Sequence, residues 1–408
     1  MQEFQQLSTS GLLGYGFPEA SLAAGMAREP DMIGVDGGST DPGPYYLGSG
    51  KCVNSRMSMK RDLRLKVAGS SLEQHRRKHV VTLGRLSTVI LAALAFALAA
   101  SPSSEAETMR LGHIMSANHH VNLAAQKFAE EVKKRTNGAV EIQIFPSGQL
   151  GQEKEMFESI RLGSLELGYI AGNAIEAFEP SEGLFSLPYF FKSYEHAFAV
   201  QDGPVGKEIA QRVLTKTGVR YLAYGHIGFR NTLTRARPIR GLADFAGLKI
   251  RVPPSPSFVN AFKLLGANPT PIPGGEMYTA LQTGVVDGVE GAPDILDDFK
   301  MFEVAKNYTL THHIYTDIPL VIAEPVWKAM APERRKAFEE AARVAELFER
   351  DIARQSEARV LDKLRAQGVV LIDVDTAPMR ERMQPYYEEF SKRVGGPKLI
   401  DQAISAAK

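Results

Sequence analysis

The stretch Asp244–Glu290 constrains the fold most, because it reads as two strand-and-helix units in tandem. Leu248–Val252 is short, apolar and β-capable, and Phe258–Leu265 follows it with helical spacing. Glu276–Thr283 predicts a second helix, and Val285–Val289 predicts a second strand. Strands that alternate with helices at this pitch predict a parallel sheet covered on both faces.

Arg251 and Glu290 lie where such a sheet would bind a ligand, since ligands sit at the carboxyl ends of parallel strands. Arg251 ends the first strand, just before the turn Pro253–Pro254. On spacing alone, a surface or ion-paired arginine is the simpler interpretation. A guanidinium would suit a carboxylate ligand, because it presents paired planar donors and stays protonated.

The chain before this stretch continues the alternation of strands and helices. Met109–His113 predicts a strand that ends at His113, and Leu165–Ala171 predicts another that leads to Asn173. Between them, the segment SGQLGQEKE runs into a helix start, so Glu153 faces whatever lies above the sheet. His113, Asn173 and Glu153 are therefore candidate ligand-binding residues. Stabilisation of Glu153 by the helix dipole alone is an alternative explanation for that carboxylate.

Two segments are expected to cross between domains. The strand–helix pattern restarts after His226–Arg235, and apolar strand character returns at Thr316–Ile322. Pro332–Gln367 then predicts a helix with almost no breaker, which at 1.5 Å per residue would span roughly 50 Å. A helix of this length either packs across both domains or forms a coiled coil.

The first hundred residues have a different character. Residues 1–75 are rich in Gly, Ser and Pro and predict no packed core, so they are an unusual appendage or an extension in front of the true start. Residues 76–106 combine basic residues, a short apolar run and small residues, which is typical of a secretory signal peptide. The run is shorter than the roughly 20 residues of a spanning helix, and a retained anchor is the alternative. Cys52, the only cysteine, precedes the expected cleavage site, so a mature chain would form no disulfide.

Composition and motifs exclude several classes of function. The chain has 48 Lys and Arg against 47 Asp and Glu, so neither nucleic acid nor an anionic membrane is indicated as a partner. The adjacent pairs His119-His120 and His312-His313 lack zinc-site spacing, and neither a GxSxG nor a Rossmann GxGxxG motif is present. No metal, cofactor or catalytic residue is therefore predicted.

Five segments together resemble one known family. The run GLKIRVP, then LLGANPTPIP, then YTALQTGVVDGVE resembles the solute-binding proteins of tripartite ATP-independent periplasmic (TRAP) transporters, the DctP-like family. The upstream segments GHIGFRNTLTRARPI and FPSGQLGQEKEMFESIRLGSLELGYI are similar to the same family's pattern. The resemblance covers nearly all of the chain from about Met109 to the C-terminus.

The resemblance implies an α/β, two-lobed fold like that of periplasmic binding proteins, with one long helix that braces both lobes. The expected boundaries are an extension at 1–75, a signal peptide at 76–106, lobe I at 107–227 with about 317–350, lobe II at 228–316, the bracing helix at 332–367 and a C-terminal segment at 368–408.

The resemblance also implies roles for residues at the cleft. Arg251 matches the family's carboxylate-binding arginine, and Arg230 matches a second arginine, for which an interdomain salt bridge is the alternative. Glu153 and Glu290 would accept hydrogen bonds from hydroxyl groups of the ligand. The chain departs from the family at Gly291, where Asn is frequent, and at Gly274-Gly275, which suggests a roomier pocket floor.

The function implied is that of a periplasmic receptor, expected as a monomer, that captures a small organic acid and delivers it to the membrane subunits of a TRAP transporter. A sugar acid or another hydroxylated carboxylate fits the arginine and acidic pattern. The alternatives are a receptor for a sensor system and a periplasmic enzyme that acts on a carboxylated sugar. After signal cleavage, no stable membrane insertion is expected.

The signal-peptide interpretation predicts a processed chain. Mass spectrometry of periplasmic protein should find an N-terminus between about Ala99 and Thr108, because the small residues that suit cleavage lie there. An intact chain that begins at Met1 and is held in the membrane would contradict the prediction.

Overall fold

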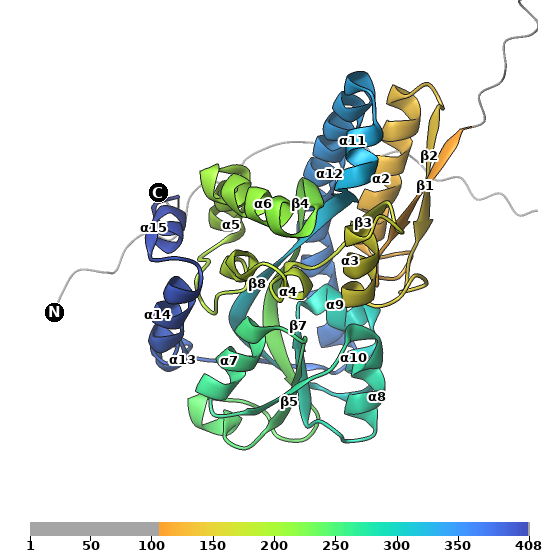
Figure 1. Cartoon of the computed structure of the whole chain (residues 1–408). Helices are drawn as coiled ribbons and strands as arrows, with labels where there is room; N and C mark the ends of the chain where they lie inside the picture. Colours follow the sequence, from red (N-terminus) through yellow and green to blue (C-terminus); the bar gives the residue numbers. More distant parts are fainter. Residues whose placement is uncertain (1–105, 407–408) are drawn as a thin grey trace, which may run out of the picture. The chain divides into compact units, whose positions relative to one another are not determined.

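The structure, a computed structural model, describes residues 106–406, and Figure 1 shows their arrangement. The expected extension at 1–75 and the expected signal peptide at 76–106, apart from its last residue, lie outside these residues. No helix in the described part of the chain is both long enough and apolar enough to cross a membrane.

One sheet of nine strands organises the described chain. Eight strands follow the order β2-β1-β3-β8-β4-β7-β5-β6, and β9 pairs with β8. Their bounds are β1 Glu107–Gly112, β2 Val140–Phe145, β3 Leu167–Tyr169, β4 Val219–Thr234, β5 Lys249–Val252, β6 Asn268–Pro271, β7 Gly288–Gly291, β8 Asn307–Ala323 and β9 Val370–Asp373.

The sheet as a whole is mixed, and the parallel arrangement predicted from the stretch Asp244–Glu290 is confirmed for β5–β7. The groups β1–β3 and β5–β7 are each parallel, but β8 is antiparallel to β3 and β4, and β4 is antiparallel to β7. The long strands β4 and β8 contain the two segments that were expected to cross between domains, and they pair along most of their length. The register of this pair shifts at three places, one of them between His226 and Gly228.

Helices cover both faces of the sheet. Their bounds are α2 His120–Arg135, α3 Glu153–Arg161, α4 Gly172–Ile175, α5 Tyr194–Asp202, α6 Pro204–Thr217, α7 Pro256–Leu264, α8 Met277–Gln282, α9 Pro293–Asp298, α10 Met301–Val304, α11 Glu324–Ala329, α12 Pro332–Ala366, α13 Ala377–Glu381, α14 Gln384–Arg393 and α15 Lys398–Ser405. Three 3₁₀ turns complete the set, namely η1 Pro180–Leu184, η2 Leu242–Phe245 and η3 Gly274–Glu276.

Local sequence explains where several elements begin and end. Helix α6 stops at Gly218, whose φ of 70° is the left-handed conformation that glycine adopts without strain. Strand β6 was not predicted, because its sequence Asn-Pro-Thr-Pro lacks β-forming residues. It pairs only with β5 at the end of the sheet, where prolines do not interrupt a ladder on both sides.

Helix α12 braces both lobes. Near its start, Phe338 packs edge-to-face on Phe128 of α2, with ring centroids 5.7 Å apart. Near its end, Leu364 is fully buried in the apolar cluster that holds Val289 of β7. The helix therefore contributes to the core on the β1–β3 side and to the core on the β5–β7 side, and Figure 1 shows α12 beside α2.

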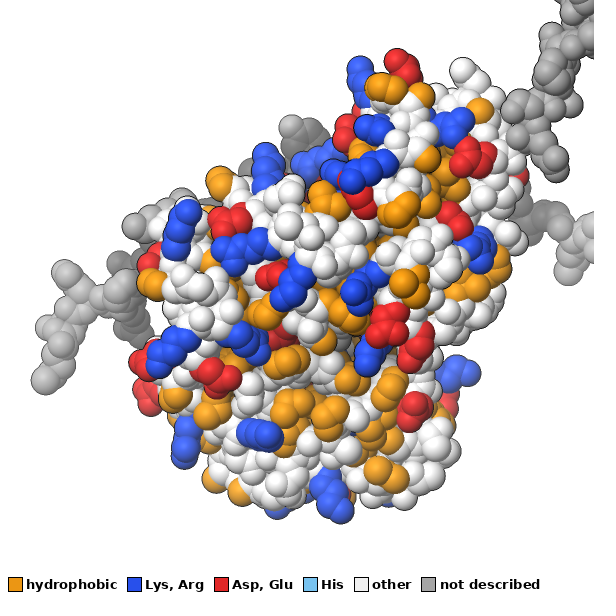
Figure 2. All heavy atoms as spheres, in the orientation of Figure 1, with side chains coloured by type: hydrophobic (Ala, Val, Ile, Leu, Met, Phe, Trp, Pro, Cys, Tyr) orange, Lys and Arg blue, Asp and Glu red, His pale blue; other side chains and the backbone are white. Residues whose placement is uncertain are grey.

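Charge is spread evenly over the visible surface. Figure 2 shows acidic and basic side chains interspersed across the face in view, as the nearly equal numbers of each type suggest. This pattern is that of a solvated surface rather than of a site for a polyanion.

Glu182 and Asp317 form a fully buried pair of carboxyl groups next to strand β4. Burial and the proximity of Asp317 raise the pKa of Glu182, and burial raises the pKa of Asp317 to about 7. Two carboxyl groups in such surroundings share a proton at neutral pH. Because the unfolded chain releases that proton near pH 4, the stability that the pair contributes is complete below about pH 4 and is lost as the pH rises to about 7.

Asp317→Asn should remove most of this pH dependence. The free energy of unfolding of the variant, relative to that of the wild type, should increase by on the order of 2 kcal/mol when the pH is raised from about 4.5 to about 7.5. Urea unfolding at both pH values measures the difference. Asp373→Asn, at an exposed position of β9, is the control and should follow the wild type. If Asp317→Asn changes the free energy of unfolding by the same amount at both pH values, the two carboxyl groups do not share a proton.

Candidate functional site

A cavity of about 220 Å³ lies where β4, β5, α3 and α4 meet. Its volume is below the 300–1,000 Å³ usual for drug-sized ligands, so it suits a small solute. The polar part of its wall includes Gln152, Glu153, Asn173, Arg230 and Arg251, and the apolar part includes Ile114, Ile227, Met277, Ile295 and Phe299. Four of the six predicted ligand residues, namely Arg251, Arg230, Glu153 and Asn173, therefore meet at one cavity.

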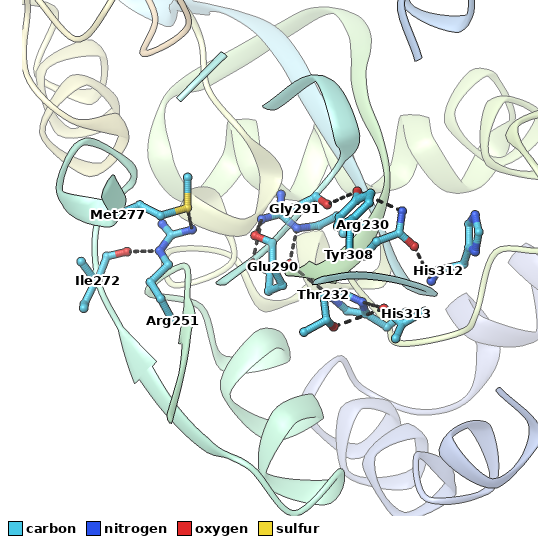
Figure 3. A network of polar contacts seen from close by, with 12 residues as sticks. Arg230, Thr232, Arg251, Ile272, Met277, Glu290, Gly291, Tyr308, His312 and His313 are labelled. Carbon is cyan, nitrogen blue, oxygen red and sulfur yellow. Dashed lines mark hydrogen bonds and ion pairs between the residues drawn. The ribbon is translucent and has the colours of Figure 1, made fainter. Parts of the chain in front are cut away.

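Arg251 is held by backbone and sulfur rather than by an acidic side chain. It lies on β5 with 4% of its surface exposed. Its Nε donates to the carbonyl of Ile272 at 2.8 Å, and its Nη1 lies 3.4 Å from Sδ of Met277, as Figure 3 shows. Burial lowers the pKa of Arg251 to about 10, which leaves the side chain charged at neutral pH. No carboxylate within residues 106–406 forms an ion pair with it.

Arg230 is neutralised by a partner inside the protein. It lies on β4, and its Nε and Nη2 donate to the two carboxylate oxygens of Glu290 on β7 at 2.5 and 2.7 Å (Figure 3). The ring of Phe258 lies under the guanidinium, 5.1 Å from its carbon. Burial alone would raise the pKa of Glu290, but Arg230 and His313 lower it to about 2. The pair stays ionised throughout the physiological range and fixes the position of Arg230.

A hydrogen-bond chain supports this ion pair from behind. The Nε2 of His313 lies 3.2 Å from Glu290, and its Nδ1 lies 2.8 Å from the hydroxyl of Thr311. An ionised carboxylate only accepts, so Nε2 carries the proton and Nδ1 accepts from Thr311. Burial lowers the pKa of His313, in agreement with a neutral ring. The hydroxyl of Thr232 extends the chain, 3.3 Å from that of Thr311.

Glu153 and Asn173 supply the other polar groups of the wall. Glu153 begins α3, and its Oε1 accepts from the backbone amide of Ala171 at 3.1 Å. Burial raises the pKa of Glu153, although the Ala171 amide, Arg251 and Arg230 oppose the rise. Asn173 lies in α4 with 4% of its surface exposed. An acceptor and an amide thus share a cavity with the two arginines, an arrangement that can bind a hydroxylated anion.

The structure does not place Glu290 or His113 in the cavity wall. Glu290 is fully buried beside Arg230, and both of its carboxylate oxygens accept hydrogen bonds from that arginine. His113 is fully buried, and its Nε2 lies 3.1 Å from Asn122 of α2. Both residues lie near a strand end, as predicted, but successive side chains of a strand point to opposite faces.

Sequence reasoning missed two features of the site. His313 was noted only as one of a histidine pair, and its contact with Glu290 depends on the pairing of β4 with both β8 and β7. Gln152 was also missed, and its Oε1 accepts from the backbone amide of Gly275 at 3.0 Å. A Cβ at Gly275 would lie only 2.7 Å from the Gln152 side chain, so the glycine permits this close approach.

His119, His120 and Asp294 are the one group of described residues with the spacing of a metal site. The amide of Val121 donates to Nδ1 of His119, so the proton of that ring is on Nε2, the atom that faces Asp294. Burial would lower the pKa of His120, but Asp294 and Glu349 raise it to about 10. These donors and acceptors suit an ion-pair cluster better than a metal ion.

The comparisons with known proteins agree with this geometry. The family described as bacterial extracellular solute-binding protein, family 7, matches residues 111–393. The chain belongs to this family, whose members are substrate-binding receptors rather than enzymes and are periplasmic in TRAP systems.

Three known proteins are similar to this chain in sequence or in structure. A solute-binding protein of Roseobacter denitrificans is 36% identical over 282 residues, which cover 69% of this chain and 86% of the relative. A TRAP periplasmic solute-binding protein of Xanthobacter autotrophicus, solved with bound β-D-galacturonate, has a TM-score of 0.70 at 34% identity and covers 73% of this chain and 98% of its own. A sugar-acid-binding protein of Advenella mimigardefordensis, solved with galactonate, has a TM-score of 0.72 at 29% identity, with 74% and 98% covered.

The buried ion pair gives a prediction about stability. Glu290→Gln leaves Arg230 buried without a charged partner, so it should lower the free energy of unfolding by roughly 3–5 kcal/mol. Urea unfolding measures the loss. Glu141→Gln, which breaks the exposed contact with Lys133, is the control and should cost less than about 1 kcal/mol. An equally small cost for Glu290→Gln would contradict the positioning role.

Proposed function

We propose that this chain is the receptor for a small sugar acid with one carboxylate and that it delivers this solute to a TRAP transporter. The observation that carries the proposal is Arg251, a buried guanidinium at the cavity wall that forms no ion pair with a described carboxylate. A buried charge of this kind is stabilised when a ligand supplies the opposite charge in a bidentate contact.

Counting the charges supports a single carboxylate. The positive charge of Arg230 is already matched by Glu290, so Arg251 is the buried cation that remains for a ligand. Lys154 and Glu155 also line the cavity, but both are exposed and their charges are opposite. A second carboxylate would meet the acidic side chain of Glu153, which also lines the cavity. Like charges in a buried site oppose binding, so a monocarboxylate fits better than a dicarboxylate.

The remaining polar groups fit the hydroxyl groups of a sugar acid. Glu153 can accept from a hydroxyl, and the amide of Asn173 can both donate and accept. Apolar side chains such as Ile227 and Phe299 can cover the carbon skeleton. The ligands named for the two solved relatives, galacturonate and galactonate, are monocarboxylates of this kind.

The further parts of the proposal rest on membership of the family. We place the mature chain in the periplasm as a monomer, with lobe I at 107–227 and about 317–350 and lobe II at 228–316. The solute would bind between the lobes and stabilise their closed arrangement. Binding and release involve no bond making or breaking, so the solute should leave chemically unchanged.

Replacement of Arg251 tests the proposal. Arg251→Ala should raise the dissociation constant of the better-bound of galacturonate and galactonate by about 30-fold to several-thousand-fold, since truncation of a buried charge pair costs roughly 2–5 kcal/mol. Arg251→Lys should recover little, because an ammonium lacks the paired planar donors. Isothermal titration with each variant measures the change.

Arg237→Ala serves as the matched control, since Arg237 lies outside the cavity wall and donates only to the exposed carbonyls of Asp244 and Ala246. It should bind like the wild type. Near-native affinity in a folded Arg251→Ala variant would remove the basis of the proposal.

A further inference from the structure

We propose that Glu176 is a positioning residue for the solute site, because its carboxylate joins two walls of the cavity that come from distant parts of the chain. The inference rests on the proposed function, but Glu176 itself does not line the cavity. Its role would be to hold the solute-binding groups in register, so that its loss weakens binding while every group that contacts the solute remains.

The first wall is carried by α4. Asn173 and Ala174 lie in this short helix, Ala177 follows it, and all three line the cavity. Glu176 directly follows the last residue of α4 and has 2% of its surface exposed. Its carboxylate is therefore shielded from solvent, and any movement of α4 also moves this carboxylate.

Glu176 contacts the second wall through the first turn of α7. The Oε2 of Glu176 accepts from the Ser255 hydroxyl at 2.5 Å and from the Ser257 amide at 3.2 Å, and its Oε1 accepts from the Ser257 hydroxyl at 2.8 Å. These serines come directly after Pro253 and Pro254, which line the cavity. Glu176 thus bonds to the segment that continues from Arg251.

Helix α7 depends on this outside partner for its N-terminal cap. Ser255 occupies the N-cap position, but its side chain makes no capping hydrogen bond to its own helix. The Glu176 carboxylate instead accepts from the free amide of Ser257, where a negative charge also interacts favourably with the helix dipole. The start of α7 is consequently fixed relative to α4 as well as by Pro256 at its first position.

The first turn of α7 also supports the second arginine of the site. Phe258, the residue after Ser257, lies under the guanidinium of Arg230. A shift of this turn would move the ring that Arg230 stacks on, as well as the Pro253–Pro254 wall beside Arg251. Both arginines are thus linked to Glu176 through packing and not through a shared hydrogen bond.

A cation from the C-terminal segment completes the arrangement. The Nη2 of Arg393 in α14 donates to Oε1 of Glu176 at 2.6 Å, which neutralises the buried carboxylate. Tyr386 of the same helix lies 2.9 Å from the Ser257 hydroxyl. A Cβ at Gly183 would lie 2.7 Å from Oε1, so a side chain there would displace the carboxylate. Three separate segments therefore converge on one side chain.

The test compares Glu176→Ala with Glu179→Ala. Glu179 lies three residues further along the chain, at the N-cap of η1, and its carboxylate caps Ser181 without reaching α7. With galacturonate and galactonate as probes in stopped-flow binding, Glu176→Ala should raise the dissociation rate constant about tenfold and leave the association rate constant within about twofold. Glu179→Ala should lower the melting temperature but keep both rate constants.

A second variant approaches the same contact from the opposite wall. Ser255→Ala with Ser257→Ala removes the two hydroxyl contacts of Glu176 and keeps its contacts with the Ser257 amide and Arg393, so it should raise the dissociation rate constant by less than Glu176→Ala does. Adding Glu176→Ala to it should raise the rate constant by less than the sum of the separate effects, because the hydroxyl contacts are already lost. If Glu176→Ala does not fold, the double serine variant still tests the contact. Unchanged dissociation in folded variants, or full additivity of their effects, would overturn the proposal.

Hydrogen exchange separates this inference from the proposed function. In the solute-free protein, Glu176→Ala should speed exchange both at the Ser257 amide and in α4 around Asn173, whereas Glu179→Ala should affect only η1. If the wild type binds neither galacturonate nor galactonate, the sugar-acid proposal fails. The hydrogen-exchange measurement then tests the positioning role of Glu176 on its own. Unchanged exchange at Ser257, or a change confined to one wall, would overturn it.

Discussion

The buried ion pair of Arg230 and Glu290 is the interaction on which the site depends. A charge removed from water is tolerated when an opposite charge and further hydrogen bonds satisfy it, and Glu290 does this for Arg230 with both oxygens. His313 holds Glu290 in turn. Because this pair is balanced inside the protein, the second guanidinium, Arg251, is the buried positive charge that the cavity presents to a solute.

The fold places this pair at the junction of its two halves. Arg230 lies on β4 and His313 on β8, the two long antiparallel strands that connect the β1–β3 group with the β5–β7 group. The cavity wall then draws Glu153 and Asn173 from one half and Arg251 from the other. A site built in this way changes shape when the halves move, which couples solute binding to closure.

The sequence predicted those parts of the structure that depend on local pattern. The strand ending at Arg251, the helix start at Glu153 and the long helix α12 follow from periodicity and breakers, and the structure brings Arg251, Glu153 and Asn173 to one cavity. The antiparallel course of β4 and β8 was not predicted, because pairing between residues as distant in sequence as Val219 and Ala323 leaves no local signal. Strand β6 was not predicted because its sequence Asn-Pro-Thr-Pro lacks β-forming residues. The same reason explains Glu290, since only the register of β4 and β7 shows that Arg230 lies against it.

If the solute carboxylate neutralises the charge of Arg251, removal of that carboxylate charge should weaken binding, and changing the charge of the solute tests this most directly. Isothermal titration should compare galacturonate with its methyl ester, which keeps the ring and the hydroxyl groups but is neutral. We expect the acid to bind and the ester to bind at least about 30-fold more weakly, the change expected for loss of a buried charge partner. Equal affinity for acid and ester would contradict this expectation.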